Sequence, residues 1–231
     1  QGPASEDILI GLADADDSVV VNVPEDKMIV QSVDFFRAIV DDPYVFGKIT
    51  ANHCLADIFA MGARPIALLN SLRFGQPFDH RTRFLLSGVI GGISSYGNCI
   101  GIPDVGGEIF FSDTYKGNPL VNAMCVGIIE NGKIASASAE SPGDLLLLVG
   151  ADTGRDGIHG ASGLASQTFE DDRELRTTVQ VGNPFMEKVL IEACLEALQV
   201  CPEGIAGMQD LVAAGLTSAT VELSLINISE P

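Results

Sequence analysis

The residues best suited to chemistry are four aspartates that follow or interrupt apolar segments. Asp17 and Asp34 each follow a β-rich run, Asp210 ends the segment Gly-Met-Gln-Asp, and Asp57 lies among apolar neighbours, where a carboxylate should be paired or metal-bound. Carboxylates at strand ends converge at one edge of a sheet, and Mg²⁺ prefers oxygen ligands that it can bridge to substrate phosphates. The pattern indicates a magnesium site. The alternative is that these Asp residues cap helices or stabilise turns.

Two glycine-rich segments could approach a phosphate or a substrate. Residues 150–163 follow an apolar run, and Arg155 could add a donor to backbone N–H groups there. This segment matches neither common phosphate-binding glycine motif, so a turn-rich connection is equally compatible. The second segment, residues 96–108, ends in the carboxylate of Glu108. The three histidines, His159 among them, lack metal-ligand spacing, which favours structural or surface roles.

Apolar periodicity predicts a mixture of strands and helices. Strands are expected at 8–12, 18–23, 27–33, 65–72 and 121–129. Helical spacing after Asp42 predicts a helix that Gly62 ends, and a second helix is expected over 81–96. No internal repeat interrupts this order, which is typical of an α+β fold.

A small, polar stretch near 138–143 marks a domain boundary, giving domains at 1–140 and 143–223. The second domain is expected to open with a strand at 145–149 and to contain a helix over 184–198 after the cap residue Asn183. Another helix begins near 216–221 without a partner for its apolar face. Residues 224–231 resemble the translation of a sequencing adapter, so we expect a non-native tail and a truncated second domain.

The composition excludes several classes of protein. There are 31 Asp and Glu against 13 Lys and Arg, a net charge of −18, which disfavours binding to nucleic acid or to anionic membranes. No apolar stretch approaches the length that spans a bilayer. The five cysteines are odd in number and form no Cys-x-x-Cys pair, which fits a reducing, cytoplasmic location.

Long phrases of the chain resemble phosphoribosylformylglycinamidine synthase, the amidotransferase of purine biosynthesis. They are residues 57–75, 96–101, 105–108, 117–127, 153–160, 180–188 and 207–218. Residues 10–21, 31–36 and 40–53 instead resemble selenophosphate synthetase, a member of the same ATP-binding superfamily. Both resemblances imply an aminoimidazole-ribonucleotide-synthetase-like α+β fold, with an N-terminal mixed-sheet domain and a truncated C-terminal α/β domain.

The resemblance also implies roles for individual residues. Asp57 and Asp210 match metal carboxylates of the purine enzyme, and Gln180 matches a substrate-contacting Gln. Asp17 and Asp34 match metal or ATP carboxylates of the selenide enzyme. Glu108 would line the nucleotide cleft on the ATP side. Arg155 and His159 would contact substrate, or else only hold their loop.

The activity implied is the ATP-dependent conversion of formylglycinamide ribonucleotide to formylglycinamidine ribonucleotide with Mg²⁺ and glutamine-derived ammonia. The partners implied are a separate glutaminase, the nucleotide substrate, and a second copy that pairs through the open N-terminal sheet. The chain lacks the synthase's Glu-Ser-His-Asn-His-Pro segment before Asp57 and has Ala56 in place of an Arg. Phosphorylation of selenide and an inactive chimeric or truncated fragment therefore stay open as alternatives.

Overall fold

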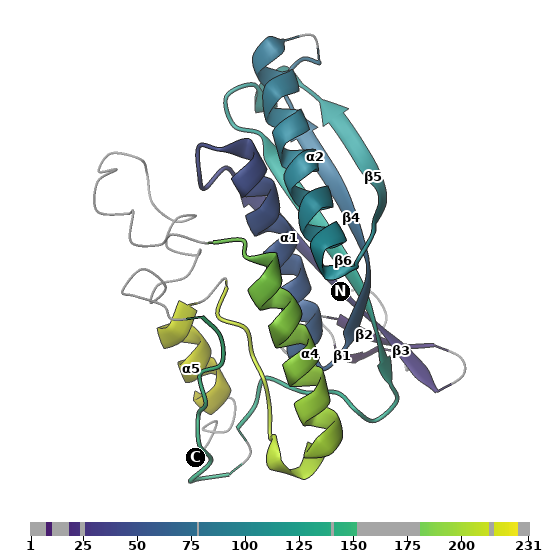
Figure 1. The fold of residues 1–231 in the computed structure, drawn as a ribbon, viewed down its shortest axis with the longest axis vertical. Coiled ribbons are helices and arrows are strands. Elements are labelled where there is room, and N and C mark those ends of the chain that lie inside the picture. The colour runs from purple at the N-terminus through teal and green to yellow at the C-terminus, as the bar shows by residue number, and fades with distance from the viewer. Residues whose placement is uncertain are drawn as a thin grey trace.

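The computed structural model describes residues 8–10, 19–23, 26–77, 79–139, 141–151, 181–212 and 215–225. Their centre is a six-stranded sheet in the order β1-β2-β3-β6-β4-β5 (Figure 1). The strands are β1 (Ile8–Ile10), β2 (Val19–Val23), β3 (Lys27–Arg37), β4 (Arg64–Phe74), β5 (Asp104–Phe111) and β6 (Leu120–Glu130). Neighbouring strands are antiparallel except β4 and β5, which are parallel. The expected mixed sheet is thereby confirmed.

Helices cover one face of this sheet. They are α1 (Pro43–Ala60), α2 (His80–Ile100), α4 (Pro184–Val200) and α5 (Gly215–Leu225), with 3₁₀ turns η1 (Asp113–Tyr115) and η4 (Pro202–Gly204). α1 contacts β3 and β6, while α2 and α4 pack against α1 (Figure 1). Because α1 lies between the sheet and α4, most of its residues are buried, and a polar side chain on its inner side must find a partner.

Cap residues set the start of helices α1 and α4. The Asp42 carboxylate accepts hydrogen bonds from the backbone N–H of Tyr44 at 2.8 Å and of Val45 at 3.1 Å. The Asn183 side chain likewise accepts from Phe185 and Met186. Each cap precedes a proline at the first helical position, where the missing N–H costs nothing. Both helices therefore begin where the sequence predicts.

Two glycines let α1 and α2 approach each other at backbone distance. A Cβ at Gly47 would collide with the carbonyl oxygen of Val89, and a Cβ at Gly92 would collide with that of Tyr44. The close approach holds α1 firmly over the inner face of the sheet.

Alternation along β3 separates an inner face from an outer face. Met28, Val30, Ser32 and Phe36 are buried beneath the helices, whereas Val33 and Phe35 are exposed on the opposite side. β3 extends to Arg37, beyond the predicted end at Val33. Asp34 therefore lies inside the strand, on its inner face, and the strand's alternation rather than its end directs this side chain.

Two sequence predictions differ from the structure. The predicted strand Leu145–Val149 has no strand pairing within the described residues, and its side chains are 54–94% exposed. A run of this composition becomes a strand only when a neighbouring strand completes its hydrogen bonds. Conversely, the sequence predicts a glycine-rich bend over residues 96–108, where β5 begins. Its pairing with β4 makes it a strand, and Gly107 lies against the backbone of Asn70, where no Cβ would fit.

Candidate functional site

The inner face of β3 and the last turns of α1 bring two predicted carboxylates together. Asp34 projects from β3 beneath the helices, and Asp57 lies one turn before the end of α1. The Ser32 hydroxyl, two residues before Asp34 on the same face, donates a hydrogen bond to Asp57 Oδ2. Asp34 and Asp57 lie close enough for each to influence the ionisation of the other.

Asp210 joins this pair from the segment between η4 and α5. Its Oδ1 accepts the backbone N–H of Val212 at 2.9 Å, which holds the side chain in place. Its Oδ2 is buried and has no hydrogen-bond donor among the described residues. Asp210 also interacts with both Asp34 and Asp57. The structure thus collects three sequence-predicted carboxylates, from β3, α1 and the C-terminal segment, in one place.

Burial and neighbouring carboxyls raise the pKa of Asp57 and of Asp34. Burial, followed by the neighbouring carboxyl groups of Asp210 and then Asp34, raises the pKa of Asp57 to about 11. Burial and the charge of Asp210 also raise the pKa of Asp34. The main influences on both groups are therefore loss of solvent and other carboxyls. A cation entering this acidic cluster, defined as Asp34, Asp57 and Asp210, would relieve the repulsion.

A fourth carboxylate, Glu187 on α4, interacts with Asp210 of the acidic cluster. Its side chain is only 4% exposed, and burial followed by repulsion from Asp210 raises its pKa to about 8. Glu187 is not evident as a site residue from sequence, because an acidic residue in the first turn of a helix normally lies in solvent and interacts with the helix dipole. The available signal was spacing: Glu187, Ile191 and Leu195 recur every four residues and form the buried stripe of α4.

The acidic cluster has the donor chemistry for a hard divalent cation such as Mg²⁺. The orphaned Oδ2 of Asp210 is a buried oxygen that lacks a donor among the described residues, and carboxylate oxygens are the ligands Mg²⁺ takes. Across the described ranges no group of three or more Asp, Glu, His or Cys side chains is placed so that it could hold a metal ion. A cation held by Asp57 and Asp210 would therefore complete its shell with water or phosphate oxygens, as Mg²⁺ usually does.

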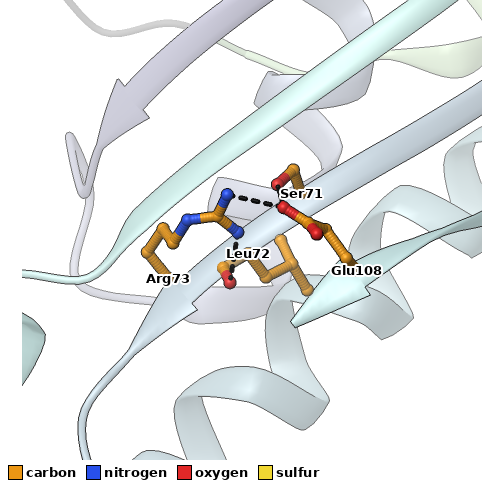
Figure 2. Close-up of polar contacts among 4 residues, drawn as sticks. All are labelled: Ser71, Leu72, Arg73 and Glu108. Carbon is orange, nitrogen blue, oxygen red and sulfur yellow. Dashed lines mark hydrogen bonds and ion pairs between the residues drawn. The ribbon is translucent and has the colours of Figure 1, made fainter. Parts of the chain in front are cut away.

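Glu108 lies elsewhere, on the outer face of the sheet. Figure 2 shows its carboxylate between Ser71 and Arg73: Arg73 Nη2 lies 2.6 Å and Ser71 Oγ 2.9 Å from Glu108 Oε1. The hydrogen bond and charge of Arg73, together with Ser71, lower the pKa of Glu108. Arg73 also lies over the ring of Phe110, 5.7 Å from its centroid. The sheet therefore separates Glu108 from the acidic cluster.

The remaining predicted site residues are not placed by the structure. Asp17, Arg155, His159 and Gln180 all lie outside the described residues. No helix in the described part of the chain is both long and apolar enough to cross a bilayer.

Comparison with known proteins defines the family. Residues 15–129 match the N-terminal domain, and residues 141–227 the C-terminal domain, of AIR synthase related proteins. The chain therefore belongs to the AIR synthase related family. The acidic cluster takes Asp34 and Asp57 from the first matched region and Asp210 from the second.

Within this family the chain is similar to PurL. It is 48% identical over 224 residues to the phosphoribosylformylglycinamidine synthase subunit PurL of Thermoanaerobacter sp. (strain X514), covering 97% of this chain and 29% of that protein. It is 55% identical over 183 residues to PurL of Carboxydothermus hydrogenoformans, covering 79% of this chain and 25% of that protein. The first alignment leaves out few residues, so it includes most of the N-terminal part that resembles selenophosphate synthetase.

Solved structures of T. maritima PurL share the fold. The complex with FGAR superimposes with a TM-score of 0.75 at 38% identity, covering 88% of this chain and 32% of that chain. The complex with ATP gives a TM-score of 0.71 at 34% identity, covering 93% and 32% respectively. The chain thus spans about a third or less of the PurL proteins that it matches.

Proposed function

We propose that this chain is part of the synthetase portion of a phosphoribosylformylglycinamidine synthase. The observation that carries the proposal is the acidic cluster, because three partly buried carboxylates from both family regions interact there in a chain similar to PurL. T. maritima PurL has been solved with FGAR and with ATP, which supports these two compounds as ligands of the present chain.

The reaction proposed is amide activation by ATP. The amide oxygen of formylglycinamide ribonucleotide attacks the γ-phosphoryl group, ADP leaves, and the carbon then bears a phosphate in place of a poor leaving group. Ammonia attacks that carbon and inorganic phosphate departs, which gives the amidine. Phosphoryl transfer of this kind depends mainly on positioning and on electrostatic stabilisation.

In this proposal the chain's own residues hold and orient the nucleotide phosphates. Asp57 and Asp210 would hold Mg²⁺, with Asp34 beside them, and the ion would neutralise charge on the phosphates. Ser32 orients Asp57 through its hydroxyl, and Val212 orients Asp210 through its backbone N–H. With a net charge of −18, the chain would accept an anionic nucleotide together with a cation.

The outer face of the sheet supports a proposal about assembly. Val33, Phe35 and Phe110 are 51%, 67% and 54% exposed on the face opposite the helices. Exposed apolar side chains on β3 and β5 make this sheet face a candidate interaction surface. We assign this face to pairing with the sheet of a second copy or of a second AIR synthase related domain. A cytoplasmic glutaminase supplying ammonia is the further partner proposed.

Calorimetric titration of the chain with Mg-ATP tests the proposal. The wild-type chain should bind Mg-ATP, and Asp57→Asn or Asp210→Asn should weaken binding at least tenfold, the effect of losing a ligand carboxylate. The exposed variant Asp41→Asn should bind like wild type. Formylglycinamide ribonucleotide should bind as well, whereas selenide should have no effect on ATP hydrolysis. Mg-ATP affinity that is unchanged in both cluster variants would contradict the proposal.

A further inference from the structure

A cavity of about 390 Å³ opens where β3 and β4 end and where α1 and α2 begin. We call it the strand-end pocket, and its lining residues fall within 38–46, 74, 81–89 and 117–119. Asp57 lies fourteen residues after Pro43, the first residue of α1, which at about 1.5 Å per residue is roughly 21 Å along the helix. The strand-end pocket is therefore a separate place from the acidic cluster.

The floor of the strand-end pocket is apolar and is held by two helices and the sheet. Phe46 of α1, Phe74 at the end of β4 and Val89 of α2 line it, and each is at most 2% exposed. Beside them, a Cβ at Gly88 would collide with the ring of Pro43, so α2 packs directly against the start of α1. A preformed apolar cavity of this size is typical of a small-molecule site.

Three polar side chains line the same cavity: Arg81, Asp41 and Asn118. Within the described residues none of these side chains makes a hydrogen bond, and no ion pair joins Arg81 to Asp41. Neighbouring charged residues have local roles. The Asp42 carboxylate caps α1, and Arg83 Nε donates to a backbone carbonyl at 3.1 Å. Arg81 and Asp41 have no such role in the described structure.

Two opposite charges beside an apolar floor define the chemistry of a ligand. The guanidinium of Arg81 favours a carboxylate, with which it can form two parallel hydrogen bonds. The Asp41 carboxylate favours an ammonium group, and the Asn118 amide can donate to the first group or accept from the second. A ligand with a single charge would leave the other charged side chain unpaired and partly desolvated beside its apolar body, which weakens binding.

We propose that the strand-end pocket binds a small zwitterion with an apolar side chain, which is the chemistry of a hydrophobic α-amino acid. Its carboxylate lies on Arg81, its ammonium group on Asp41, and its side chain against Phe46 and Phe74. This binding site is additional to the acidic cluster and does not depend on the reaction proposed for that cluster.

Heteronuclear NMR titration of the chain with three related probes tests this inference. L-phenylalanine carries both charges, hydrocinnamate lacks the ammonium group, and phenethylamine lacks the carboxylate. L-phenylalanine should shift the amide signals of residues 38–46 and 117–119 and should bind about tenfold more tightly than either analogue, because each analogue loses one hydrogen-bonded charge. Equal affinities for the three probes, or no binding of L-phenylalanine, would overturn the inference.

Substitutions at the two charged residues assign each contact. Arg81→Gln should weaken the binding of L-phenylalanine about tenfold and leave that of phenethylamine unchanged, whereas Asp41→Asn should weaken L-phenylalanine and leave hydrocinnamate unchanged. Arg83→Gln, on the same helix, is the matched control and should bind all three probes like wild type. Gly117→Leu adds a side chain beside the cavity, where a Cβ meets nothing within 4 Å, and should abolish binding.

The variants also separate this inference from the proposed function. Arg81 and Asp41 are exposed, so Arg81→Gln and Asp41→Asn should fold like wild type. If both bind L-phenylalanine with wild-type affinity, the inference is wrong, and the acidic cluster is unaffected. Mg-ATP should bind Arg81→Gln as it binds wild type, and a loss of Mg-ATP binding there would contradict the separation of the two sites.

Discussion

Replacing Asp57 by Asn should make the metal-free chain more stable at neutral pH. In the unfolded chain this carboxyl has its ordinary pKa of 3.8 and is ionised at pH 7, whereas in the folded chain its pKa is about 11. The folded state therefore holds a proton that the unfolded state has lost, and stability falls as the pH rises between these two values. At about 1.4 kcal/mol per pH unit, the penalty at pH 7 is about 4 kcal/mol. Asn does not ionise, so Asp57→Asn removes this free-energy penalty.

Urea unfolding of wild type and Asp57→Asn at pH 5, 7 and 9, with EDTA present, measures this effect. The difference in the free energy of unfolding should widen with pH, by up to about 1.4 kcal/mol per unit, because only wild type pays the increasing penalty. The Asn side chain can still accept from Ser32, and its amide can donate to a neighbouring carboxylate as the protonated acid does. Asp41→Asn at an exposed position should unfold like wild type. The reasoning is refuted if Asp57→Asn is less stable than wild type, or if the difference is independent of pH.

Two further substitutions test the packing and the outer face. Gly47→Ala places a Cβ against the Val89 carbonyl and should lower the free energy of unfolding by about 2 kcal/mol or more, whereas Gly91→Ala, whose Cβ meets only ordinary contacts, should be neutral or stabilising in the same urea unfolding experiment. Phe35→Asp should reduce self-association measured by analytical ultracentrifugation while leaving the far-ultraviolet circular dichroism unchanged, since Phe35 is 67% exposed. Unchanged association in Phe35→Asp would exclude this face as the contact between copies.

The elements with strong local signals are the ones that the sequence predicts well. Asp42 and Asn183 each precede a proline, and α1 and α4 begin where those signals place them. Where the predicted secondary structure was wrong, the pairing of strands in the folded chain decides the outcome. β5 is a glycine-containing segment that becomes a strand because β4 pairs with it. Leu145–Val149 has stronger local β character but no strand pairing in the described structure.

The candidate site also contains residues that the sequence identifies and residues that only the fold brings together. The apolar surroundings of Asp57 identify it from sequence as a carboxylate that needs a partner. The partners themselves come from β3 and from the Asp210 segment, which only the fold brings to it. Glu187 could be found only by noticing that it shares the spacing of Ile191 and Leu195, the buried residues of α4. Glu108 has a motif that suggests a site, but the alternation of β5 places it on the other side of the sheet.

The most direct measurement is the anomalous diffraction of crystals of this chain grown with MnCl₂ and a non-hydrolysable ATP analogue. The account predicts an anomalous peak at the acidic cluster, with carboxylate oxygens of Asp57 and Asp210 about 2.1 Å from the ion and phosphate oxygens completing its shell. An ion bound with the analogue elsewhere, leaving Asp57 and Asp210 without metal contact, would contradict it.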